Sequence, residues 1–124
     1  MTTADAIART RAYIDRHWEE TFRVSREETA GEIALPHPHT VPSTDPTMWL
    51  FFYWDTYFTN LGLIRQGRTA QARNNAENVL HLIERLGYVP NISVRIALNL
   101  TQIPVAAVLL DEPHRLAPDR AWLE

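Results

Sequence analysis

The neighbouring side chains of Trp54 and Asp55 are of types that together can bind a polyhydroxylated ligand. The indole of Trp54 offers a flat, largely apolar face on which a pyranose ring can stack, because one face of such a ring carries mainly C–H groups. The carboxylate of Asp55 can accept two hydrogen bonds from hydroxyl groups, and such charge-assisted bonds are strong. Each residue also has an ordinary structural role, since tryptophan often fills a core and aspartate often caps the following helix. For Asp55 the two roles are compatible.

Other reactive chemistry has little support in the sequence. The chain has no cysteine, which excludes a disulfide scaffold, thiolate zinc sites, iron–sulfur clusters and a cysteine nucleophile. His37 and His39 flank a proline, but two histidines without a third ligand make a weak metal site, and the other histidines lack ligand spacing. There is no glycine-rich phosphate loop and no Gly-x-Ser-x-Gly motif. We therefore expect no metal and no cofactor.

Length and composition indicate one globular domain with an ordinary core. The 124 residues are 45% apolar and carry a net charge of −3. Without a strongly basic balance, a nucleic-acid partner is not expected. Residues 1–18 lack the continuous apolar stretch of a signal peptide, and the apolar run at residues 105–110 is too short to cross a bilayer. These observations predict a cytoplasmic protein without membrane contact.

A helix is predicted to open the chain, followed by a proline-rich loop. Apolar residues recur at helical spacing over residues 4–20, and Thr2 or Thr3 can cap this helix. Residues 25–48 contain four prolines, which remove backbone donors and disfavour helix, so this segment is predicted to be extended and irregular. Loops of this length usually carry function or are disordered.

An antiparallel helical hairpin is predicted after the aromatic run that contains Trp54. The spacing predicts helices near residues 56–66 and 70–86, with Gly67 ending the first and Thr69 capping the second. The predicted contact face comprises Leu61, Ile64, Ala72, Ala76, Val79, Leu80, Ile83 and Leu86. With no substantial sheet expected, the predicted fold class is all-α.

Two further helix signals occupy the last part of the chain. One helix is expected to follow Thr101, with Pro104 in its first turn, and to run through Leu110, ended by residues 111–113. Residues 118–124 indicate the start of another, which stops after about two turns and is marginal by itself. We therefore expect residues 1–124 to be a single incomplete domain of a longer protein.

Four segments of the chain carry motifs of one enzyme family. Residues 52–63, FYWDTYFTNLGL, contain an aromatic pair and then Trp-Asp-Thr-Tyr-Phe. Residues 77–91, ENVLHLIERLGYVPN, are similar to ENFLYLIERYGFIPN, and residues 99–104, NLTQIP, are similar to NRSQPP. Residues 35–42, LPHPHTVP, are similar to a segment of bacterial members. Over residues 33–110 the chain thus resembles the trehalase-like glycoside hydrolases of families 37 and 63.

The resemblance implies a fold and a reaction. The fold is an (α/α)6 barrel, of which this chain is the N-terminal part with helical hairpins and a long proline-rich loop. Family members cleave α-glucosidic bonds, trehalose being the best-known substrate, with inversion that requires a carboxylic acid and a carboxylate base. In the family both groups lie beyond the stretch covered here. Because Glu77, Glu84 and Asp111 are predicted to be solvated charges, no catalytic residue is assigned to this chain.

The resemblance also assigns sugar-binding roles to Trp54, Asp55, Asn91 and Gln102. In a closed barrel these residues are expected to meet at one mouth, because barrel loops gather at the ends. Asn91 follows a proline and could instead be a turn residue. Gln102 could instead be a polar residue at the start of a helix. A small carbohydrate is the partner that these roles imply.

The chain departs from the family at two cationic positions. Val94 and Leu100 stand where family members carry arginines, although the adjacent Arg95 could replace the first of these. Losing a cationic donor costs about 1–3 kcal/mol for each buried group left unpaired. The substrate could therefore differ from trehalose, or the pocket could have lost its function.

Two classes of function stay open at this point. The first is a trehalase-type glycoside hydrolase, represented here by its N-terminal part. The alternative is a noncatalytic helical fragment or a protein-interaction module, for which the aromatic run at residues 51–54 offers an anchoring surface. Self-association is a further expectation, since an exposed apolar helix face formed by Val105, Val108 and Leu109 would promote it.

Overall fold

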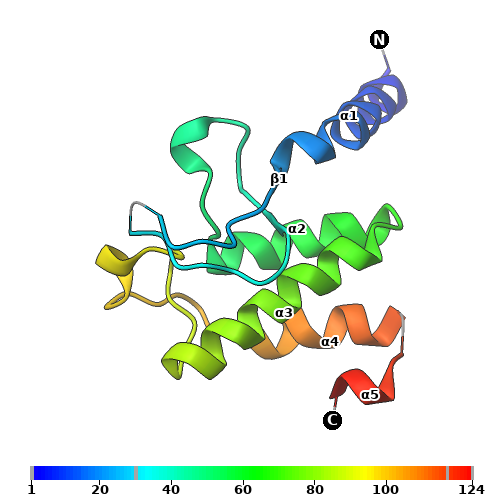
Figure 1. The fold of residues 1–124 in the computed structure, drawn as a ribbon. Helices are drawn as coiled ribbons and strands as arrows, with labels where there is room; N and C mark the ends of the chain where they lie inside the picture. The colour runs from blue at the N-terminus through cyan, green and yellow to red at the C-terminus, as the bar shows by residue number, and fades with distance from the viewer. Residues whose placement is uncertain (1, 30, 117, 124) are drawn as a thin grey trace.

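The computed structural model describes residues 2–29, 31–116 and 118–123 and shows a predominantly helical protein (Figure 1). The α-helices are α1 (Thr3–His17), α2 (Tyr53–Arg65), α3 (Thr69–Leu86), α4 (Ala106–Leu116) and α5 (Arg120–Leu123). Short 3-10 turns lie at Trp18–Thr21, Pro46–Met48 and Arg95–Ala97, and the strands β1 (Phe22–Arg23) and β2 (His39–Thr40) pair antiparallel. The prediction of a mainly helical fold without substantial sheet is confirmed for the described residues.

The core is built by α2, α3 and α4, and α3 contacts both of the others. Its buried apolar residues are Ile33, Leu35, Phe51, Tyr53, Ala76, Val79, Leu82, Val89 and Leu109. Phe51 and Tyr53 are thus core residues, only 1% and 3% exposed. The interpretation of the whole aromatic run as an anchoring surface is therefore wrong for these two side chains.

The helix boundaries follow local signals closely at several positions. Thr2 caps α1, and the Thr2 and Asp5 side chains exchange hydrogen bonds with each other's backbone in a capping box. Gly67 has φ 75° in the turn between α2 and α3, a left-handed conformation that glycine adopts without strain. Thr69 is the first residue of α3 rather than its cap, because Arg68 occupies the capping position. The predicted hairpin is confirmed, with its second helix starting one residue earlier.

Most of the predicted face of α3 is buried: Ala72, Ala76 and Val79 fully, and Ile83 and Leu86 partly, against the core. Leu63 is fully buried, whereas Leu61 and Ile64 are half-buried. On α3, Leu82 is fully buried but Leu80 is 39% exposed. The proline-rich loop also packs on α3, so the buried face extends toward the loop, while Leu80 on the other side lies at the surface.

Two buried asparagines of α3 hold the proline-rich loop. Asn78 accepts a hydrogen bond from the His37 N–H at 3.1 Å and donates one to the His37 carbonyl at 3.0 Å. Asn75 accepts from the Thr40 N–H at 3.1 Å and donates to the Thr40 hydroxyl at 2.9 Å. Backbone groups that the prolines leave without a regular partner are thus satisfied, which allows an irregular loop to lie against the core.

The helix α4 extends beyond its predicted end. It continues through Pro113, which is itself buried, although a proline inside a helix cannot donate a backbone hydrogen bond. Leu109 is fully buried against the core, so the expectation that it lies on an exposed apolar face is wrong. Val105 is also partly buried, and Val108 remains 46% exposed. The packing of α4 on α3 turns this face inward and stabilises the extra turn.

The two ends of the chain are placed differently. The helix α1 has no buried residue and projects away from the other helices (Figure 1). At the other end α5 begins at Arg120, two residues after the predicted start, and Glu124 lies outside the described residues. Trp122 of α5 packs against the core, with the Arg73 guanidinium 4.9 Å from the centre of its ring. In the described part of the chain, no helix combines the length and apolar character needed to span a bilayer.

Candidate functional site

The start of α2 brings the expected site residues together. The Tyr53 N–H donates to the Asn91 carbonyl at 3.0 Å, and the Trp54 N–H donates to Gln102 Oε1 at 3.1 Å. The residue before the helix, Phe52, provides no side-chain cap. Free N–H groups at a helix start need acceptors. Here the chain 38 to 48 residues further along supplies them, so Trp54, Asn91 and Gln102 lie at one place, with Asp55 next to Trp54.

Trp54 presents part of its ring to solvent. Its side chain is 39% exposed and its ring meets that of Phe58 edge to face, with 6.0 Å between the ring centres. Phe58, one helical turn later, is itself 58% exposed. An edge contact of this kind holds the indole without hiding both of its faces. Trp54 is thus not a core residue, which was the alternative interpretation of this position.

Asp55 lies in the first turn of α2 but is not its cap. Among the described residues, its carboxylate has no hydrogen-bond or ion-pair partner. A carboxylate in the first turn of a helix interacts favourably with the helix dipole. Both of its oxygens are therefore available to accept hydrogen bonds from a ligand.

Asn91 and Gln102 offer complementary groups. The Asn91 backbone is fully used, since its carbonyl accepts from Tyr53 and its N–H donates to the Leu100 carbonyl at 2.8 Å. Its side-chain Oδ1 is buried without a hydrogen-bond partner in the described structure. Gln102 Oε1 accepts from the Trp54 N–H, and the amide N–H groups of Gln102 make no hydrogen bond among the described residues, so they can donate to a ligand. Gln102 precedes α4 by four residues and is not part of that helix.

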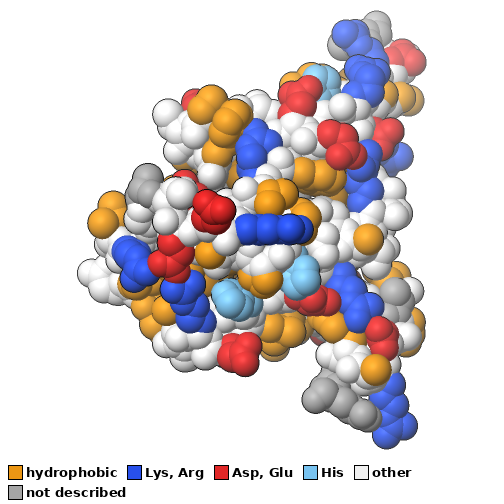
Figure 2. All heavy atoms as spheres, in the orientation of Figure 1, with side chains coloured by type: hydrophobic (Ala, Val, Ile, Leu, Met, Phe, Trp, Pro, Cys, Tyr) orange, Lys and Arg blue, Asp and Glu red, His pale blue; other side chains and the backbone are white. Residues whose placement is uncertain are grey.

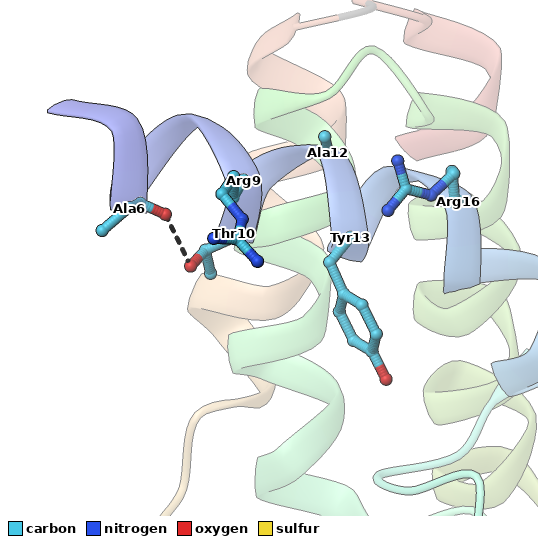
Figure 3. Close-up of a pocket in the computed structure, with 6 residues that line it drawn as sticks. All are labelled: Ala6, Arg9, Thr10, Ala12, Tyr13 and Arg16. Carbon is cyan, nitrogen blue, oxygen red and sulfur yellow. Dashed lines mark hydrogen bonds between the residues drawn. The ribbon is translucent and has the colours of Figure 1, made fainter. Parts of the chain in front are cut away.

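A surface hollow elsewhere on the molecule does not coincide with this site. It has a volume of about 480 Å³ and is lined by six residues that all belong to α1 (Figure 3). The Tyr13 ring and the guanidinium groups of Arg9 and Arg16 extend from one side of this helix. On the face shown in Figure 2, acidic and basic side chains are interspersed rather than segregated into one basic stripe. We therefore place the candidate site at the start of α2.

Comparison with known proteins identifies the family. The family model described as Trehalase matches residues 2–115. The chain belongs to the trehalase family. A periplasmic trehalase of Xanthomonas campestris pv. campestris is 33% identical over 103 residues, which are 82% of this chain and 18% of that protein. A periplasmic trehalase of Pseudomonas aeruginosa is 31% identical over 109 residues, which are 88% of this chain and 19% of that protein.

These relatives correct the expected location and show what share of a complete relative this chain covers. The prediction of a cytoplasmic location is contradicted, because the related proteins are periplasmic trehalases. That prediction relied on the lack of an apolar stretch in residues 1–18, and such a lack carries no information about the compartment. The chain spans about a fifth of the length of these relatives, 18–19%.

The two residues that replace the family's arginines, Val94 and Leu100, make contacts of other kinds. Val94 makes an isolated antiparallel bridge with Glu32, and Leu100 is 53% exposed while its carbonyl binds the Asn91 N–H. The neighbouring Arg95 does not replace the missing arginine, since its guanidinium pairs with Glu28. Hydrogen bonds from Arg85 and Arg95 lower the pKa of the Glu28 carboxyl, which keeps this ion pair charged. Among the described residues, neither position 94 nor position 100 therefore supplies an arginine to the candidate site, and Arg95 is engaged with Glu28.

The other carboxylates and histidines that were considered for catalysis or metal binding form neither an acid–base pair nor a metal site in the described structure. Glu77 is half-buried and pairs with His37 at 2.9 Å and with Arg73 at 3.3 Å. Glu84 is exposed, and so is Asp111. The buried His39 faces Phe51 edge-on instead of sharing a ligand with His37. The described residues contain no cluster of three or more side chains that could hold a metal ion.

Proposed function

We propose that this chain forms one side of the sugar-binding site of a trehalase-type glycoside hydrolase. The complete protein would hydrolyse trehalose or a related α-glucoside by an inverting acid–base mechanism, and the relatives support a periplasmic location. The observation that carries the proposal is the meeting of Trp54, Asp55, Asn91 and Gln102 at the start of α2 in a member of this family. The proposed (α/α)6 barrel would use α2, α3 and α4 as part of its wall.

The chemistry of the four side chains suits a glucose ring. The Trp54 indole provides a stacking face, and the charged Asp55 carboxylate accepts hydrogen bonds from two hydroxyl groups. Asn91 Oδ1 is a buried acceptor without a partner, and leaving such a group unpaired costs about 1–3 kcal/mol. Gln102 adds the N–H donors of its side-chain amide to the set. Because a hydroxyl group both donates and accepts, such a mixed set recognises a neutral sugar better than an ion.

Catalysis would need groups from outside these residues. An inverting glycosidase holds its acid and base roughly 6.5–9.5 Å apart on opposite sides of the scissile bond. Glu77 is committed to His37 and Arg73, and Glu84 and Asp111 are exposed. Asp55 is proposed to bind hydroxyl groups rather than to transfer protons. The role of this chain is therefore to bind and orient the sugar.

A variant of Gln102 can test this proposal without disturbing the fold. Gln102→Glu keeps an oxygen for the Trp54 N–H but removes the amide donor, so the start of α2 stays capped. Methyl α-glucoside and trehalose are titrated into the full chain while the indole N–H signals are followed by NMR. We expect saturable shifts at Trp54 and a dissociation constant about tenfold higher in the variant, the effect of one lost hydrogen bond.

Trp49 is a matched internal control for this titration. It is 40% exposed, as Trp54 is 39% exposed, but the Arg23 guanidinium lies over its ring and it directly follows the proline-rich loop. Its signal should not move. Equal shifts at Trp49 and Trp54, or an unchanged affinity in the Gln102→Glu chain, would contradict the proposed site.

A further inference from the structure

Tyr53 connects the candidate site to a second helix. It is the first residue of α2, and its ring is 3% exposed within the core. Its hydroxyl oxygen accepts a hydrogen bond from the Ala106 N–H at 2.8 Å. Ala106 is the first residue of α4, and the residue before it, Val105, has no side-chain acceptor. The Tyr53 hydroxyl thus takes the place of a cap at the start of α4.

The start of α2 and the segment that leads into α4 therefore hold each other in place. Gln102, on the segment that leads into α4, accepts from the Trp54 N–H of α2, while Tyr53 of α2 accepts from the Ala106 N–H of α4. The segment between Gln102 and Ala106 contains Pro104 and a tight turn in which the Val105 N–H donates to the Ile103 carbonyl. Such a segment is short and stiff, so a shift at one hydrogen bond moves the other.

We propose that Tyr53 is a positioning residue for the sugar site, acting through its hydroxyl on Gln102. This inference rests on the proposed function, because it assigns Tyr53 a part in the affinity for sugar. The Tyr53 hydroxyl fixes the start of α4, which fixes the segment that carries Gln102. Gln102 in turn fixes the first turn of α2, where Trp54 and Asp55 lie. Tyr53 itself is buried and does not touch the ligand.

Two substitutions separate this role from simple stabilisation. Tyr53→Phe removes only the hydroxyl and leaves the Ala106 N–H without an acceptor. Ala106→Pro removes that N–H at the first helical position, where proline is well tolerated. The double variant contains neither partner, so no buried donor is left unpaired, yet the connection between α2 and α4 is still missing. Tyr57→Phe is the matched control, since the Tyr57 hydroxyl has no hydrogen-bond partner among the described residues.

Three measurements on the full chain complete the experiment: the melting temperature, the amide exchange rate of Trp54, and the affinity for methyl α-glucoside. Tyr53→Phe is expected to lower the melting temperature, speed Trp54 exchange about tenfold and raise the dissociation constant about tenfold. In the double variant the melting temperature should return toward that of the unchanged chain, while Trp54 exchange and sugar affinity stay at the Tyr53→Phe values. Tyr57→Phe should leave all three unchanged.

Each result decides a separate claim. Recovery of exchange rate and affinity together with stability in the double variant would show that Tyr53 has a merely structural role and would overturn the inference. Unchanged Trp54 exchange in Tyr53→Phe would also overturn it. If the unchanged chain shows no sugar-dependent shift at Trp54, the proposed function fails, whereas Trp54 exchange still reports on the connection between Tyr53 and Gln102.

Discussion

Replacing Asn75 by alanine should destabilise the fold severely. Asn75 is fully buried on α3 and makes hydrogen bonds with Thr40, Asn60 and Gln71. In Asn75→Ala, the Thr40 N–H and Asn60 Oδ1 lose this partner, and both residues are 1–2% exposed, so water does not replace it. At about 1–3 kcal/mol for each orphaned group, the expected loss is about 2–6 kcal/mol. That is a large part of the about 5–15 kcal/mol that stabilises a typical domain.

Urea unfolding followed by far-UV circular dichroism measures this loss. Asn74→Ala is the matched control, because the side chain of the neighbouring Asn74 makes no hydrogen bond among the described residues and is half-buried. The control should change the free energy of unfolding by less than about 0.5 kcal/mol. If Asn75→Ala is too unstable to measure, Thr40→Val removes only the hydroxyl contact and should cost about 1 kcal/mol. Equal midpoints for the Asn75→Ala and Asn74→Ala chains would refute the stabilising role of the Asn75 hydrogen bonds.

Three further predictions concern pH, packing and activity. Burial and the nearby Arg23 charge lower the pKa of His39 to about 4, below its ordinary 6.5. The unfolded chain therefore binds more protons than the folded one between these values, so the free energy of unfolding decreases as the pH falls through 6.5, by about 2 kcal/mol at pH 5 relative to pH 8. Urea unfolding at pH 8 and pH 5 measures this loss, and His39→Gln should remove it. Leu109→Ala should cost about 2–5 kcal/mol and Val108→Ala less than about 1 kcal/mol, and comparable urea midpoints would contradict the packing of α4. The isolated chain should not release nitrophenol from a nitrophenyl α-glucoside, and turnover that disappears when Glu77 is replaced would show otherwise.

The helices of this chain could be predicted because their signals are local. Apolar periodicity and a glycine at each end mark α3, and a threonine three residues before an aspartate marks the start of α1. The end of α4 could not be predicted in the same way. Pro113 is a strong local stop signal, but Pro113 and Leu109 are buried by α4 packing, and that packing depends on residues distant in sequence.

The buried face of α3, wider than predicted, has a similar cause. Periodicity shows that α3 has an apolar side, but not that a second surface of the helix is covered by the proline-rich loop. The buried Asn75 and Asn78 are the signal that was missed, because they lie next to the apolar stripe at positions that a solvated helix would leave exposed. Buried amides on a helix indicate that irregular backbone packs against it, since they can bind an N–H and a carbonyl together.

The start of α2 shows how a site can be recognised from a missing local signal. Phe52 cannot accept a hydrogen bond through its side chain, so the sequence contains no cap at the point where the Trp-Asp motif begins. A helix start without its own cap needs acceptors from elsewhere, and here the Asn91 carbonyl and the Gln102 side chain provide them. The resemblance had assigned these same two residues to the sugar. The same two hydrogen bonds therefore cap α2 and form the proposed site, because they bring Asn91 and Gln102 next to Trp54 and Asp55.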